Sequence, residues 1–194
     1  MKGKKIGILI GVSAVVVAVG ASVTVTQQNE YKLIRQFGKV DRVISSSGIS
    51  FKITFIESTQ SLPKETLLYD LAASDVITKD KKTMISDSYV LWKISDPLKF
   101  AQTLNSSVES GESRINTAVY NATKNAISSM SQDQVITSRD GELSDMVMEA
   151  IGTNMDQYGI ELLKFETKQL DLPDDNKRHR DRKSGSAGMP RPIS

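Results

Sequence analysis

The pattern of hydrophobic and polar positions predicts strands first, then helices, then one last strand. Residues 23–37, 49–55, 66–71 and 83–94 carry the alternation that is typical of half-buried strands. Residues 76–78 and 83–94 flank four charged residues at 79–82, and two β-rich runs around such a polar tip predict a hairpin. Both faces of 83–94 are partly apolar, so this strand is expected to be central and covered on both sides, with Trp92 in the core.

The period changes to three and four residues in the second half of the domain. Pro97 suits the first turn of a short helix after Asp96. The first long helix carries Ile115, Ala118, Val119, Ala122, Ala126, Ile127 and Met130 on one face, and a second, from about Ser138, carries Leu143, Met146, Val147, Ala150, Ile151 and Met155. Residues 160–170 alternate again, which predicts a strand with Leu163 and Phe165 pointing inward.

This order of elements favours an α+β domain, with an antiparallel-type sheet and packed helices, over residues 27–176. Residues 177–194 contain many basic, Gly, Ser and Pro residues and almost no apolar ones, so we expect a disordered tail. Residues 1–5 form a short basic head.

Residues 6–26 contain no charge, and a helix of that length spans about 30 Å, the thickness of a bilayer's hydrocarbon core. The sequence therefore predicts a transmembrane anchor over 6–26. The lysines that precede it place the N-terminus in the cytoplasm and the rest of the chain across the membrane. The anchor positions are Ile6, Ile8, Leu9, Ile10, Val12, Val15, Val16, Val17 and Val19, and the topology residues are Lys2, Lys4 and Lys5.

A cleaved secretory signal is the alternative for this segment. The basic start and the small residues Val19-Gly20-Ala21 suit a signal peptidase. A buried core helix is a third interpretation, although the β-branched residues Val15-Val16-Val17 have a low propensity for helices in water. Both leading readings export the body of the chain from the cytosol.

The charge balance changes how the basic pI of about 8.7 is interpreted. The formal net charge of the chain is +2. The head contributes +3 and residues 177–194 contribute +5, so residues 6–176 carry a net charge of −6. The folded part therefore has no basic surface for nucleic acid, and nucleic acid is not an expected partner. The lysines at 79, 81 and 82 are read as a solvated hairpin tip, with a contact for lipid headgroups or for a partner as the alternative.

Composition argues against most enzyme chemistry. With no Cys and a single histidine, His179 in the basic tail, the chain has no thiolate nucleophile, no Ser-His-Asp triad on a rigid scaffold and no His or Cys metal cluster. A Ser-Lys hydrolase remains as the alternative, but no Gly-x-Ser-x-Gly elbow occurs. The adjacent acids Asp174 and Asp175 are read as solvated loop residues. We expect no catalytic, cofactor or metal site, and the methionines at 130, 146, 148 and 155 to be core residues.

Five ordered segments resemble the SPFH superfamily of stomatins, prohibitins and flotillins, and within it the bacterial HflC family most closely. The segments are QQNEYKLIRQFGKV (27–40), SGISFKITFIEST (47–59), TKDKKTMISDSYVLWKISDP (78–97), TSRDGEL (137–143) and GIELLKFETKQLDLPDD (159–175).

The resemblance implies a non-enzymatic scaffold in the bacterial inner membrane, with a single span and a periplasmic domain. Members self-associate, assemble with an HflK-type paralogue around the membrane AAA protease FtsH, and modulate its access to substrates. An envelope-anchored binding or structural module without a protease link is the alternative.

The chain differs from the family after the segment Leu172-Pro173-Asp174. Members continue there into a long Ala/Glu/Arg-rich helix that forms a coiled coil, whereas here Asn176 and Lys177 lead into the basic tail without heptads. We therefore expect a C-terminally truncated form whose assembly rests on its globular domains and is weaker.

Overall fold

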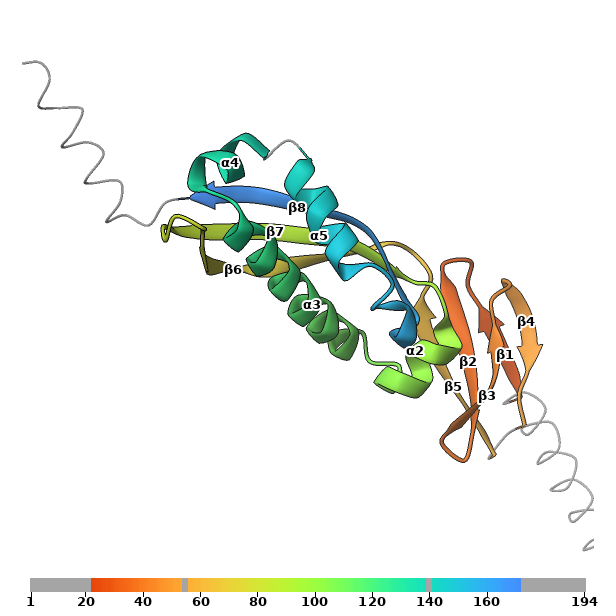
Figure 1. The fold of residues 1–194 in the computed structure, drawn as a ribbon. Helices are drawn as coiled ribbons and strands as arrows, with labels where there is room; N and C mark the ends of the chain where they lie inside the picture. Colours follow the sequence, from red (N-terminus) through yellow and green to blue (C-terminus); the bar gives the residue numbers. More distant parts are fainter. Residues whose placement is uncertain (1–21, 54–55, 139–140, 172–194) are drawn as a thin grey trace, which may run out of the picture. The chain divides into compact units, whose positions relative to one another are not determined.

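The computed structural model describes residues 22–53, 56–138 and 141–171. They fall into two compact units (Figure 1). Of the described residues, the first unit contains 22–53, 56–66, 93–111 and 156–161, and the second contains 67–92, 112–138, 141–155 and 162–171. Each unit is described by itself.

Five short strands form two small antiparallel sheets in the first unit. Strands β1 and β4 pair with each other, and β2 pairs with β3 on one side and β5 on the other. Leu33, Ile34 and Leu62 are fully buried at its centre, because β2 is the middle strand. The bounds are β1 Val23–Thr26, β2 Glu30–Gln36, β3 Lys39–Ile44, β4 Gly48–Phe51 and β5 Glu57–Pro63.

The turn between β2 and β3 consists of Phe37 and Gly38, with φ angles of 49° and 84°. Two successive positive φ values give the type I′ turn, whose twist matches that of the flanking strands. Gly38 adopts such an angle freely, whereas Phe37 does so at a cost.

Helix α2 (Pro97–Leu104) begins where the sequence predicts it. The Asp96 carboxylate accepts hydrogen bonds from the backbone N–H groups of Leu98 and Lys99, both at 3.0 Å, and so satisfies two free donors of the first turn. Phe100 and Leu104 are buried.

Gly159 ties the start of α2 to the segment after the short 3₁₀ helix η2 (Asp156–Tyr158). Its carbonyl accepts hydrogen bonds from the backbone N–H groups of Ser95 at 2.9 Å and Asp96 at 3.2 Å. Its φ is 70°, and a Cβ there would lie 2.2 Å from the Asp96 carbonyl oxygen. Only glycine fits, because both the backbone angle and the close approach exclude a side chain.

The second unit is built on a three-stranded sheet in the order β6-β7-β8, with helices against one face (Figure 1). Its core comprises Met84, Val90 and Trp92 from β7 and the apolar stripes of the helices, so the buried Trp92 and most of the predicted helical faces are confirmed. The second face is wrong at Ala150, which is exposed, and Met155 lies beyond the end of α5. The bounds are β6 Leu67–Ile77, β7 Thr83–Ile94, β8 Ile160–Asp171, α3 Val108–Ser129, α4 Gln132–Thr137 and α5 Glu142–Ile151.

Strand β7 is the central strand, as predicted, but it is not covered on both sides. Its even-numbered residues are buried, whereas its odd-numbered residues are half-exposed. The open face carries Asp87 and Tyr89, which pair with Lys168 and Glu166 of β8. These polar groups keep their hydrogen bonds at an open face, so no second layer is needed to cover them.

The predicted hairpin is also confirmed, with Ile77 opposite Thr83, and its charged tip has a structural role. The Asp80 carboxylate accepts hydrogen bonds from the Thr78 hydroxyl at 2.6 Å and from the backbone N–H of Gln132 at 3.1 Å. The Thr78 hydrogen bond is the main reason that the pKa of Asp80 falls to about 2. The tip is thereby fastened to the first residue of α4.

Several elements differ from the sequence prediction. Strand β3 was not expected. Strand β5 and helix α4 were not expected either, because their sequences, ESTQSLP and QDQVIT, are too polar to show a hydrophobic period. The helix expected from Ser138 begins at Glu142. Only Met155 of the four methionines expected in the core is fully buried, while the other three are half-buried.

The predicted anchor lies almost entirely outside the described residues. Its nine anchor positions and the three topology lysines are among residues 1–21. Its predicted end at Thr26 is wrong, because Val23–Thr26 is strand β1 and pairs with β4. Within 22–53, 56–138 and 141–171, no helix combines the length and apolar character that a bilayer crossing requires.

Replacement of Gly159 by Ala should destabilise the protein by about 2–4 kcal/mol, since the new Cβ meets the Asp96 carbonyl in addition to the strained φ. Gly38→Ala is the matched control, because its φ is also positive but nothing lies within 4 Å of the added Cβ. Chemical denaturation of both variants in detergent measures the difference, and equal losses would contradict the close approach.

Candidate functional site

Large apolar side chains are exposed at one end of the first unit. Val23 is opposite Phe51 in the β1–β4 pair, and Gln36 is opposite Glu57 in the β2–β5 pair. The Lys52 backbone N–H donates to the Ser22 carbonyl at 2.8 Å, and the Glu57 N–H donates to the Ile53 carbonyl at 2.9 Å. The start of β1, the ends of β2 and β4 and the start of β5 therefore lie together where the chain enters from residue 22. We call this cluster the apolar end, and it consists of Val23, Phe37, Phe51, Ile53 and Ile56, with exposures of 42, 86, 68, 55 and 42%.

The apolar end corrects one sequence expectation. Residues 49–55 were predicted to form a half-buried strand, but β4 ends at Phe51, and Ile49 and Phe51 are 70 and 68% exposed. The reason is that the β1–β4 pair has no described element over its apolar face. Contiguous exposed apolar surface on a folded protein marks contact with a membrane or with another protein.

A buried carboxylate holds the apolar end in place. The side chain of Glu57 is only 4% exposed, and it accepts hydrogen bonds from Nη1 and Nη2 of Arg42, each at 3.2 Å. It also accepts from the backbone N–H of Ile53 at 2.8 Å, and Arg42 donates to the Phe51 carbonyl at 2.7 Å. The apolar side chains are therefore presented from a fixed backbone.

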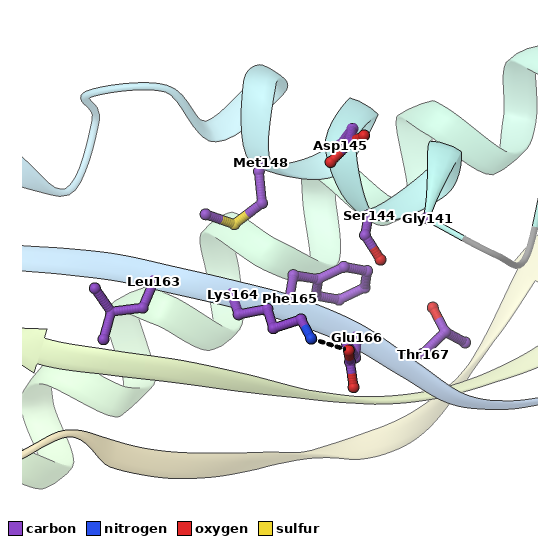
Figure 2. Close-up of a pocket in the computed structure, with 9 residues that line it drawn as sticks. All are labelled: Gly141, Ser144, Asp145, Met148, Leu163, Lys164, Phe165, Glu166 and Thr167. Atoms are coloured by element: carbon purple, nitrogen blue, oxygen red, sulfur yellow. Dashed lines mark ion pairs between the residues drawn. The ribbon is translucent and has the colours of Figure 1, made fainter.

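A groove of about 510 Å³ lies between α5 and β8 in the second unit (Figure 2). Met148 and Ser144 face it from the helix, and Leu163 faces it from the strand. Leu163 is 40% exposed, so its predicted inward position is wrong, whereas Phe165, at 1%, is buried as predicted. The lining residues are Gly141, Ser144, Asp145, Met148, Leu163, Lys164, Phe165, Glu166 and Thr167.

Serine and lysine line this groove together, which is the pair that a Ser-Lys hydrolase requires. Lys164, however, forms an ion pair with Glu166, and this hydrogen bond raises the lysine pKa above its ordinary value. A lysine acting as general base must be neutral. Lys164 is held in its charged form, so the pair lacks the base that this chemistry needs.

The same carboxylate accepts a hydrogen bond from the Tyr89 hydroxyl. This bond raises the pKa of Tyr89, because ionisation of the phenol would place two negative charges side by side. The pKa of Glu166 is lowered, chiefly by Lys164. The arrangement is a satisfied cross-strand network on the sheet.

No metal centre is apparent in the described parts of the chain, where no three His, Asp or Glu side chains converge. The adjacent acids Asp174 and Asp175 and the single His179 lie outside the described residues.

The sequence profile of the SPFH domain / Band 7 family matches residues 24–184. The chain belongs to the SPFH domain / Band 7 family. This membership agrees with the ordered segments of the sequence and with the α+β architecture, in which each unit contains antiparallel strand pairs and helices pack against the β6-β7-β8 sheet of the second.

Curated relatives of this SPFH domain protein include several HflC proteins. Protein HflC of Haemophilus influenzae is 27% identical over 80% of this chain and 56% of its own length. The Modulator of FtsH protease HflC of Escherichia coli K12 is 28% identical over 72% of this chain and 44% of its own length. The chain thus spans about half the length of these relatives. An uncharacterized protein of Methanocaldococcus jannaschii is 27% identical over 88% of this chain and 82% of its own length.

Replacement of Glu166 by Gln should lower the pKa of Tyr89 toward the ordinary tyrosine value of about 10, because the phenolate no longer faces a carboxylate. Ultraviolet titration of tyrosinate absorption, with Tyr89→Phe to identify the signal, measures the shift. Glu161→Gln is the control, since Glu161 pairs with Lys93 at 3.1 Å. An unchanged Tyr89 titration in Glu166→Gln would contradict the network.

Proposed function

We propose that this SPFH domain protein is a membrane-anchored, non-enzymatic scaffold that assembles with copies of itself and an HflK-type paralogue and regulates an FtsH-type membrane protease. The observation that carries the proposal is the family match over residues 24–184, together with relatives named HflC and, in Escherichia coli, modulator of FtsH protease.

The apolar end supports attachment to a bilayer. It lies where the chain enters from the predicted anchor, so its exposed phenylalanine and isoleucine side chains are positioned to enter the membrane interface. Because Val23 begins β1, the anchor extends over residues 6–22 at most. A helix of that length spans about 25 Å, near the lower limit for a crossing.

The charge pattern supports the orientation. Lys2, Lys4 and Lys5 precede the anchor and keep the N-terminus in the cytoplasm, so the domain lies on the periplasmic side of the bacterial inner membrane. The protonated Lys164 argues against hydrolase activity in the groove. Regulation would then be steric: neighbouring domains held at the bilayer form a barrier that restricts which substrates diffuse to the protease.

A fluorescent label at position 37 should report contact of the apolar end with lipid. The chain has no Cys, so Phe37→Cys gives a single labelling site, and Ser46→Cys, in the exposed loop between β3 and β4 at the other end of β3, is the matched control. In nanodiscs containing a nitroxide lipid we expect strong quenching at 37 and little at 46. Equal quenching at both positions would contradict a membrane-facing apolar end.

Size-exclusion chromatography with light scattering tests the scaffold itself. Full-length chain in mild detergent, co-expressed with an HflK-type paralogue, should run at a mass many times 21.3 kDa and retain FtsH. The chain expressed alone should also self-associate, more weakly.

A particle of one or two chains in both preparations, without FtsH, would overturn the proposal. The chain would then be an envelope-anchored module without a protease link. Omission of the paralogue and use of an FtsH-free strain separate self-association from each partner.

A further inference from the structure

A cleft of about 370 Å³ in the first unit lies between the β2–β3 hairpin and α2. We propose that it binds a phosphate group. Its lining consists of Arg35, Gly38, Lys39, Val40, Ala101, Gln102 and Asn105.

Arg35 is held in the cleft by one side-chain hydrogen bond, and one of its N–H groups has no acceptor among the described residues. Its Nη2 donates a hydrogen bond to the Ser106 hydroxyl at 2.8 Å, which orients the planar guanidinium. Its Nε is buried, and no described residue accepts a hydrogen bond from it. A buried donor without an acceptor is costly, and an anion bound beside the guanidinium would offset that cost electrostatically.

The position of Arg35 follows from a local irregularity in the ladder. The pairing of β2 with β3 shifts register between Ile34 and Arg35. Such a shift re-aims the side chains beside it, and bulges of this kind recur next to binding sites.

The chemistry of the lining matches a phosphate. Arg35 and Lys39 are the charged side chains among the residues that line the cleft, and no carboxylate lines it. Gln102 and Asn105 add side-chain amides, which also donate hydrogen bonds. Guanidinium groups bind phosphate oxygens through paired, charge-assisted hydrogen bonds, and lysine adds a mobile positive charge.

Two phosphate sources share this chemistry, a free phosphate and a lipid headgroup. Lys39 is opposite Gln36, and Gln36 is opposite Glu57, so the cleft lies within two residues of Phe37 and Ile56 in the apolar end. This proximity favours the lipid, a step that rests on the proposed membrane attachment. Binding of phosphate as such rests on the cleft alone.

A purely structural role for Arg35 is the competing explanation. Asn105 is the C-cap of α2, and a cation near a helix C-terminus stabilises the helix dipole. That role predicts a loss of stability in Arg35 variants but no response of the wild-type guanidinium to phosphate.

The first experiment follows the Arg35 Nε–H resonance by ¹⁵N NMR in full-length protein in nonionic detergent. Inorganic phosphate should shift it in a saturable way, while sodium chloride at the same ionic strength should not. Arg35→Gln identifies the resonance. No saturable shift in wild-type protein, either with inorganic phosphate or in the lipid comparison below, would overturn the proposal.

Matched variants separate the cleft from net charge. Lys39→Gln should weaken phosphate binding about tenfold, whereas Lys99→Gln, which removes an exposed lysine of α2 outside the cleft, should change it less than about twofold. Equal losses in the two variants would mean non-specific attraction and would overturn the site.

A lipid comparison assigns the source. In phosphate-free buffer, the resonance is compared in nanodiscs of phosphatidylcholine alone and with phosphatidylglycerol added. A shift that depends on phosphatidylglycerol and is lost in Lys39→Gln supports the headgroup. A shift with inorganic phosphate only supports a free-phosphate site and leaves the membrane proposal to the labelling at position 37, so the two proposals fail separately.

Discussion

The carboxylate of Glu57 determines the arrangement of the first unit. A charge that is only 4% exposed must be paired and hydrogen-bonded, and Arg42 together with the Ile53 N–H supplies this. The same arginine donates to the Phe51 carbonyl. One ion pair, with a buried carboxylate and a half-exposed arginine, thus joins β3, β5 and the segment after β4.

This arrangement explains why an apolar surface and a cationic cleft lie close together. The register of β2 with both neighbours places Gln36 beside Lys39 and Glu57. The hairpin turn at Phe37 and the cleft at Arg35 therefore belong to the same end of the unit. A bilayer surface offers both partners, hydrocarbon for the phenylalanine and phosphate for the cations.

In the second unit the ion pairs lie on an open sheet face rather than around a buried carboxylate. Its sheet buries one face under helices and leaves the other open. On that open face Glu166 bonds Tyr89 and Lys164, and Lys168 lies 2.8 Å from Asp87. The ion pair with Glu166 keeps Lys164 protonated. A composition rich in serine and lysine leaves hydrolysis open, but the pairing of Lys164 argues against it.

The sequence by itself determined the elements whose periodicity is strong: α2 after Asp96, the stripe of α3, the β6–β7 hairpin and β8, as well as the family. Polar β5 and α4 have no such period, and their pairing with β2 and with the hairpin tip depends on residues far apart in the chain. Only the tertiary structure decided which apolar faces are covered. Alternation reports that one face is apolar but not what packs on it, so Trp92 and Phe51 look alike in sequence, yet one is buried and the other is exposed.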